Sequence, residues 1–190
     1  MDRATKMLIL SAARTLFSEK GYEQTPVEEI CALAGVAKGT FFYHFESKQY
    51  IVRYILAKRL DEIAEKLYEQ MEPIYDPLSK AEFFVSSMID QSEEESEAEA
   101  YFKDGQPDWF REVQAQERMH ALYPLLEMIV AFGIEDGSFR IKNPDTVAPI
   151  AFLGIDQYLY QYALGDVSAK KGIREFTAKT LGVKETALAI

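Results

Sequence analysis

The sequence has very little of what disulfides, metal centres and membrane spans require. Its 190 residues include one cysteine, Cys31, and two histidines, His44 and His120. A single cysteine excludes an intrachain disulfide and a cysteine-rich metal site, so we expect no metal and no cofactor. No apolar run approaches the roughly 20 residues that cross a bilayer, and the first residues contain no secretory cleavage site. These absences predict a soluble protein of the reducing cytoplasm, with no membrane partner.

Basic residues are scarce overall but not everywhere. The net charge is −10, yet residues 1–60 hold nine Lys or Arg against six Asp or Glu, a net of +3. Residues 61–190 hold twelve against twenty-five, a net of −13. A small basic module joined to an acidic body can bind phosphate locally although the whole chain is acidic.

Catalytic signatures are also missing. The sequence has no evident nucleophile–base pair, no Glu-x-x-His ligand set and no glycine-rich loop that would cradle a phosphate. The acidic run from Glu93 to Glu99 is best interpreted as solvated surface, not as a metal site. We therefore predict that the protein is not an enzyme, and a helical enzyme remains an alternative.

What the sequence does have is helical periodicity from end to end. A first helix is indicated by apolar residues at i, i+4, i+7 and i+8, namely Ile9, Ala13, Leu16 and Phe17. Gly21 is placed to end this helix in the left-handed conformation, with Tyr22 packing against Phe17.

A short second helix and a tight turn follow. Thr25 is the predicted N-cap, with Pro26 at the first helical position and Glu28 completing a capping box. This helix is expected to end near Ala34, because Gly35 permits a sharp turn, and a third helix is expected over residues 38–44.

Longer helices occupy the rest of the chain. Ser47 is expected to cap a helix running to Met71, and the next begins at Asp76-Pro77. Two helices are predicted between Pro107 and Glu135, one from Asn143-Pro144-Asp145 to about Gly165, and a last one over 168–181. The expected fold is all-α, with a helix-turn-helix domain over residues 1–47 and a helical ligand-binding and dimerisation domain over 48–190.

The third helix is the strongest candidate for contact with DNA. Lys38 and Thr40 lie in its first turn, where side chains reach base edges in a major groove, and Gly39 permits close approach. Tyr43 and His44, with Lys48 and Thr25 on neighbouring helices, are suited to phosphate contacts. The predicted DNA-binding set is Thr25, Lys38, Gly39, Thr40, Phe42, Tyr43, His44 and Lys48.

Residues 9–48 resemble the N-terminal module of TetR-family repressors. The resemblance is carried by Gly21-Tyr22, Thr25, Val27, Ile30, Ala34-Gly35-Val36, Lys38-Gly39-Thr40, Tyr43-His44-Phe45 and Ser47-Lys48. It implies a homodimeric transcriptional regulator, expected to be a repressor, that binds double-stranded DNA at a palindromic operator and is released by a small molecule. Ala37 replaces the serine that often caps the third helix in the family, and Phe42 replaces a tyrosine that donates to phosphate.

Simpler interpretations apply to several of these residues. Phe41, Phe45 and Cys31 are better explained as core residues, and a lone histidine such as His44 is often structural. A helical small-molecule-binding module without DNA binding is therefore a second alternative.

The acidic body is rich in aromatic side chains, and two sets are predicted within it. An apolar, aromatic or cationic effector is expected to contact Phe84, Met88, Trp109, Phe110, Met119, His120 and Tyr123. In the family the last two helices pair across the dimer, and here their apolar stripes contain Phe152, Ile155, Leu159, Tyr162, Ile173 and Phe176.

Overall fold

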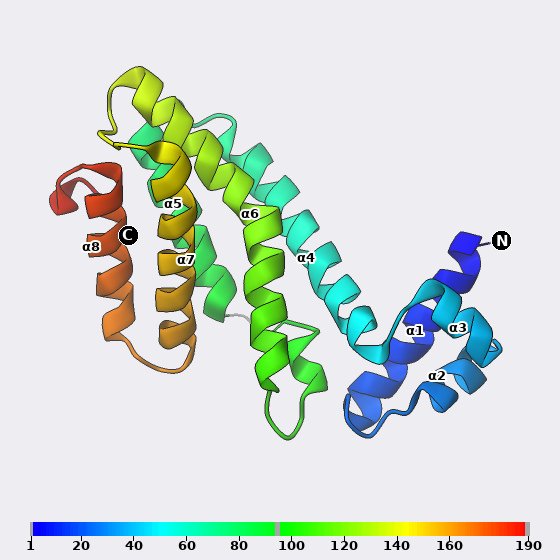
Figure 1. Cartoon of the computed structure of the whole chain (residues 1–190). Helices are drawn as coiled ribbons and strands as arrows, with labels where there is room; N and C mark the ends of the chain where they lie inside the picture. The colour runs from blue at the N-terminus through cyan, green and yellow to red at the C-terminus, as the bar shows by residue number, and fades with distance from the viewer. Residues whose placement is uncertain (1, 94–95, 189–190) are drawn as a thin grey trace. The chain divides into compact units, whose positions relative to one another are not determined.

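The computed structural model describes residues 2–93 and 96–188, and every regular element in these ranges is helical (Figure 1). The elements are α1 (Asp2–Lys20), α2 (Val27–Ala34), α3 (Lys38–His44), α4 (Lys48–Met71), α5 (Pro77–Glu93), η1 (Glu99–Tyr101), α6 (Asp108–Asp136), α7 (Pro144–Ala163), α8 (Ser168–Leu181) and η2 (Glu185–Ala187). The predicted all-α class is therefore confirmed. Within the described ranges, no helix is both long and apolar enough to span a bilayer.

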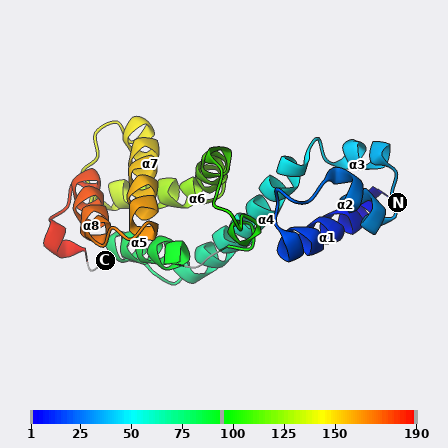
Figure 2. The ribbon, with the colours of Figure 1, turned by 90° about the horizontal axis from the view of Figure 1, so that it is seen from below.

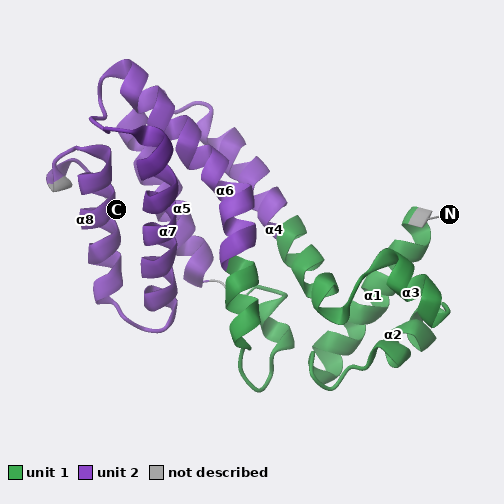
Figure 3. Ribbon diagram, viewed as in Figure 1, with its two compact units in different colours: residues 1–58, 95–114 green, residues 59–94, 115–190 purple. Residues whose placement is uncertain are grey.

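The chain divides into two compact units (Figure 3). The first comprises residues 1–58 and 95–114, and the second comprises residues 59–94 and 115–190. The predicted boundary between residues 47 and 48 differs from this division. One reason is that the first turns of α4 belong to the first unit, where Ile51, Val52 and Ile55 are buried.

In the first unit, α2 packs against α1 and α3, and η1 packs against α1. Phe17, Phe41 and Phe45 are fully buried or nearly so and form the centre of its core. Gly21 ends α1 with φ +87°, and the ring of Tyr22 lies 5.5 Å from that of Phe17. The predicted helix end and its aromatic contact are both confirmed.

An aromatic cluster packs the end of α1 against residues about eighty positions later in the chain. The Tyr22 ring lies 5.2 Å from the ring of Phe102 and 5.5 Å from that of Trp109. The Tyr22 N–H donates to the Tyr101 carbonyl at 2.8 Å, and Lys103 donates to the Glu19 carbonyl at 2.6 Å. Tyr101, Phe102 and Trp109 therefore pack with the aromatic core of the first unit, which sequence periodicity did not indicate.

In the second unit, α7 packs against both α5 and α8, and α7 and α8 lie side by side in both views (Figures 1 and 2). The two helices predicted between Pro107 and Glu135 are one, because α6 continues through Pro124. A proline inside a helix costs about 3 kcal/mol through its missing hydrogen bond and its ring. Burial of the flanking Leu122, Leu125 and Leu126 offsets that cost.

Candidate nucleic-acid interface

The turn between α2 and α3 is built as the sequence predicts. Gly35 adopts the left-handed conformation at φ 67°, and its N–H donates to the Ala32 carbonyl at 3.3 Å. The Val36 N–H closes the turn by donating to the Cys31 carbonyl at 3.0 Å. Ala37 precedes α3 in an extended conformation and provides no side-chain cap. The start of α3 is therefore held by the turn, without the roughly 1 kcal/mol that a serine cap typically contributes.

The side chains of α3 separate into a buried face and an exposed face. Phe41 and Phe45 are buried, and their rings lie 6.2 Å apart, so their predicted core role is confirmed. On the other face Phe42 is 46% exposed and Tyr43 is 76% exposed. A seven-residue helix that exposes two large aromatic rings, while Phe41 and the following Phe45 are buried, has a surface suited to a partner.

The remaining predicted residues of α3 lie on or beside this exposed face. Lys38 and Gly39 are exposed, while Thr40 and His44 are partly exposed. A Cβ built on Gly39 would meet no atom within 4 Å, so the backbone there is open to close approach. The rings of Tyr43 and His44 lie edge to face at 5.1 Å. The structure thus brings together all six residues that were predicted on α3.

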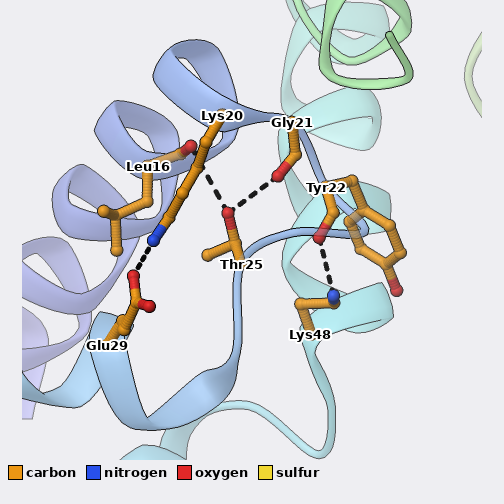
Figure 4. Close-up of polar contacts among 7 residues, drawn as sticks. All are labelled: Leu16, Lys20, Gly21, Tyr22, Thr25, Glu29 and Lys48. Atoms are coloured by element: carbon orange, nitrogen blue, oxygen red, sulfur yellow. Dashed lines mark hydrogen bonds and ion pairs between the residues drawn. The ribbon is translucent and has the colours of Figure 1, made fainter. Parts of the chain in front are cut away.

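Thr25 is not the N-cap of α2. The helix α2 begins after Pro26, without a side-chain cap, so the predicted threonine cap is wrong. Thr25 is fully buried, and its hydroxyl donates to the Gly21 carbonyl at 2.8 Å, with the Leu16 carbonyl 3.3 Å away (Figure 4). Its N–H donates to Tyr22. Because both donors are used inside the protein, Thr25 fastens the loop to the end of α1 and has no donor for a phosphate.

Lys48 lies against Tyr22. Its ammonium donates to the backbone carbonyl of Tyr22 at 2.7 Å and lies 4.1 Å from the centre of the Tyr22 ring (Figure 4). Burial lowers the pKa of Lys48 from its usual value, with an opposing effect from Glu23. An ammonium has three donors, so this arrangement fixes the head of Lys48 while two donors remain.

Each of the two glutamates in the first turn of α2 pairs with a lysine of a neighbouring helix. Glu28 accepts a hydrogen bond from Lys38 of α3 at 2.5 Å. Glu29 pairs with Lys20 of α1 (Figure 4). Lys38, the predicted base reader, therefore already has an acidic partner within the protein.

The predicted effector residues are divided between the two units. Trp109 and Phe110 belong to the first unit, where their rings pack with that of Phe102. His120 is exposed. The other predicted effector residues lie in the second unit, buried or partly buried, and are Phe84, Met88, Met119 and Tyr123.

The predicted dimer residues lie mostly in the chain's own core. Four of the predicted dimer residues are at most 5% exposed, namely Phe152, Ile155, Leu159 and Ile173. Tyr162 and Phe176 are partly exposed. The large apolar side chains that α7 exposes are instead Ile150 at 60%, Leu153 at 50% and Tyr158 at 36%.

Sequence reasoning also missed a partly buried ion pair in the second unit. The Arg118 Nε donates to Asp156 Oδ1 at 2.5 Å, and its side chain is 25% exposed against 11% for that of Asp156. The two residues lie on α6 and α7. A pairing between charges 38 positions apart has no signature in local periodicity.

Comparison with known proteins agrees with this geometry. A family model for bacterial regulatory proteins of the tetR family matches residues 9–55, which contain α2, α3 and the turn between them. The chain is 31% identical over 139 residues to the transcriptional repressor KstR2 of Rhodococcus jostii RHA1. The chain belongs to the TetR family.

Two further likenesses extend this result. The transcriptional regulator UidR of Escherichia coli K12 is 31% identical over 71 residues. The matched stretches span 70% of this chain and 66% of KstR2, and 37% of this chain and 36% of UidR. The solved structure of RolR in complex with resorcinol has a TM-score of 0.72 at 20% identity, covering 97% of this chain and 91% of that one. This solved structure thus shares the fold of this chain over nearly its whole length.

Proposed function

We propose that this protein is a ligand-responsive transcriptional regulator that binds a palindromic DNA operator as a homodimer and releases it when a small molecule binds. The observation that carries the proposal is the two-faced α3. Phe41 and Phe45 anchor this helix, while Lys38, Tyr43 and the open backbone at Gly39 face outward. In helix-turn-helix proteins the second helix of the motif reads base edges in the major groove.

In this proposal the exposed residues of α3 have separate tasks. Lys38 and Thr40 donate to base edges, and Tyr43 and His44 contact phosphates and fix the register on DNA. Lys48 adds a phosphate contact with the donors that Tyr22 leaves available. Phe42 contributes apolar contact only, because its ring has no donor for phosphate.

The dimer is proposed to form through the outward face of α7. Ile150 and Leu153 lie three positions apart on α7 and are exposed at 60% and 50%, and Leu164, which follows the end of α7, is exposed at 65%. The opposite face of α7 already packs against α5 and α8. A helix that is apolar on both faces is normally buried on both, and a second copy of α7 would cover the exposed one. Two-fold symmetry then predicts half-sites about 34–36 Å apart or at a multiple of that distance.

The effector is proposed to be a small apolar or aromatic molecule bound in the second unit. Its candidate contacts are Phe84, Met88, Met119 and Tyr123, and RolR, which has the same fold, has been solved with resorcinol. The helix α6 offers a route for the response. It carries Met119 and Tyr123 in the second unit and Trp109 in the first, so a shift along α6 would act on the aromatic contacts of Tyr22.

DNA binding is tested by fluorescence anisotropy with fragments of the protein's own promoter region at two salt concentrations. The wild-type chain should bind one palindromic fragment tightly, and its affinity should fall steeply with salt. Lys38→Ala and Tyr43→Ala should each weaken operator binding about tenfold. Lys66 and Tyr75 are exposed and belong to the second unit, outside the helix-turn-helix, so Lys66→Ala and Tyr75→Ala serve as matched controls. Unchanged binding in both α3 variants would refute the assignment of α3.

The alternative, a helical small-molecule-binding module without DNA binding, has a distinct outcome. Such a protein would bind no promoter fragment at low salt and would still gain thermal stability from its ligand. A thermal-shift screen of small phenols and fatty acyl compounds, run beside the DNA titration, separates the two functions.

A further inference from the structure

The ion pair between Glu28 and Lys38 sits where the proposed function places base recognition. Glu28 Oε1 and Lys38 Nζ lie 2.5 Å apart, and the two side chains are 63% and 58% exposed. An exposed pair of this kind adds little to folding stability. Its main consequence is therefore for what Lys38 can bind.

Both partners keep their charge through the neutral range. The hydrogen bond from Lys38 lowers the pKa of Glu28, and the same bond raises the pKa of Lys38. The pair is consequently close to neutral as a whole. A phosphate that approaches Lys38 also meets the repulsion of the Glu28 carboxylate. A neutral acceptor such as guanine O6 or N7 meets far less repulsion, and two ammonium donors remain available for it.

We propose that Glu28 is a specificity-determining residue, because it holds Lys38 and disfavours its contact with phosphate relative to base edges. The proposal rests on the proposed function, since it assumes that α3 enters a major groove. Glu28 acts through Lys38 and is therefore a positioning residue, without a base contact of its own.

The chain offers a matched control one position away. Glu28 and Glu29 are both exposed in the first turn of α2, but Glu29 pairs with Lys20 of α1. Glu28→Gln and Glu29→Gln remove the same charge from nearly the same place. Only Glu28→Gln releases Lys38.

The experiment compares affinity for the operator fragment with affinity for an unrelated duplex of equal length, over a series of salt concentrations. Glu28→Gln should raise affinity for unrelated DNA more than for the operator, so that the specificity ratio falls about fivefold or more. The salt slope for unrelated DNA should steepen by about 0.9, which corresponds to one added phosphate contact. Glu29→Gln should keep the ratio within about twofold of wild type.

A second pair of variants tests whether the effect passes through Lys38. In a Lys38→Ala background, Glu28→Gln should leave the specificity ratio unchanged, as expected for coupled residues in a double-mutant cycle. Circular dichroism melts check that each variant is folded, which is expected because the pair is exposed.

The outcomes are distinguishable. If Glu28→Gln and Glu29→Gln change the ratio equally, or if the effect of Glu28→Gln persists without Lys38, the inference is overturned while DNA binding stands. If the wild-type protein binds neither duplex, the proposed function fails, and the inference fails with it.

Discussion

The ring of Phe176 on α8 lies directly over the backbone of Gly154 on α7. A Cβ built on Gly154 would meet Phe176 ring atoms at 2.5 Å, closer than real Cβ contacts allow. The contact is matched on the other helix, where the Tyr158 ring lies 2.5 Å from the Cβ position of Gly172. The two helices therefore interlock through two glycines that each accept an aromatic ring from the facing helix.

This interlock predicts that Gly154→Ala destabilises the protein even though alanine is the better helix former. Overpacking of this kind costs about 1–3 kcal/mol, more than the roughly 0.5–1 kcal/mol that alanine gains over glycine in a helix. Urea unfolding should show the loss. Phe176→Ala makes room for the new methyl group, so adding Gly154→Ala to that variant should have little effect or stabilise it. Equal losses in both backgrounds would refute the interlock.

The exposed stripe of α7 yields a prediction about assembly. Leu153 is half exposed, and Leu153→Glu would place a charge at the centre of the proposed dimer face. A buried unpaired charge is strongly unfavourable, so sedimentation equilibrium should show a monomer with near wild-type helicity. The control is Tyr75→Glu, since Tyr75 is 85% exposed in the loop before α5 and lies off this stripe. A Leu153→Glu dimer as tight as wild type would exclude this face.

These helices also mark what the sequence could predict and what it could not. The bounds of α3 and α8 were predicted correctly, because Gly35, Ser168 and Leu181 lie at clear breaks in the local pattern. Most of the residues predicted for the dimer are buried within the chain, because α7 has apolar side chains on two faces. Periodicity finds both faces, but it cannot tell which one the chain's own helices cover.

The residues of the candidate DNA-binding site also divide into those whose place the sequence predicted and those whose place it did not. Lys38, Gly39 and Tyr43 were predicted to face outward because they lie in a short helix that follows a tight turn. All three are exposed. Thr25 was predicted to cap α2 because a threonine before proline fits a capping box. Its hydroxyl instead donates to the carbonyls of Leu16, in α1, and Gly21, just after α1. The contact of Tyr22 with Tyr101 joins residues 79 positions apart, and only the folded chain reveals it.

That contact predicts that the first unit depends on residues after position 95. Tyr101 is 1% exposed, and its ring packs 5.2 Å from that of Phe17. Replacing a buried aromatic by alanine costs about 3–5 kcal/mol, so Tyr101→Ala should weaken both folding and operator binding. Trp109 is the only tryptophan, so its emission reports directly on the cluster and should shift to the red in this variant. An unchanged emission spectrum would contradict the proposed dependence.

The buried phenol of Tyr22 makes the same cluster sensitive to alkali. Burial, with a smaller effect from Glu23, raises the pKa of Tyr22 from 10.0 to about 12. The unfolded chain therefore loses this proton at lower pH than the folded chain, and the free energy of unfolding falls as the pH rises from 10 to 12. Burial lowers the pKa of Lys48 from 10.5, so the contribution of this group to the pH dependence of stability has the opposite sign.

Tyr22→Phe keeps the ring and removes the titrating group, so it isolates this effect. Between pH 10 and pH 12 the variant should lose roughly 2 kcal/mol less stability than wild type, measured by urea unfolding at both values. Tyr75→Phe removes an exposed phenol and should retain the wild-type pH dependence. If all three proteins lose the same free energy over this interval, Tyr22 does not titrate as a buried group. A smaller loss in Tyr22→Phe alone would establish that its hydroxyl is held protonated by the packing of Phe17, Phe102 and Trp109 around it.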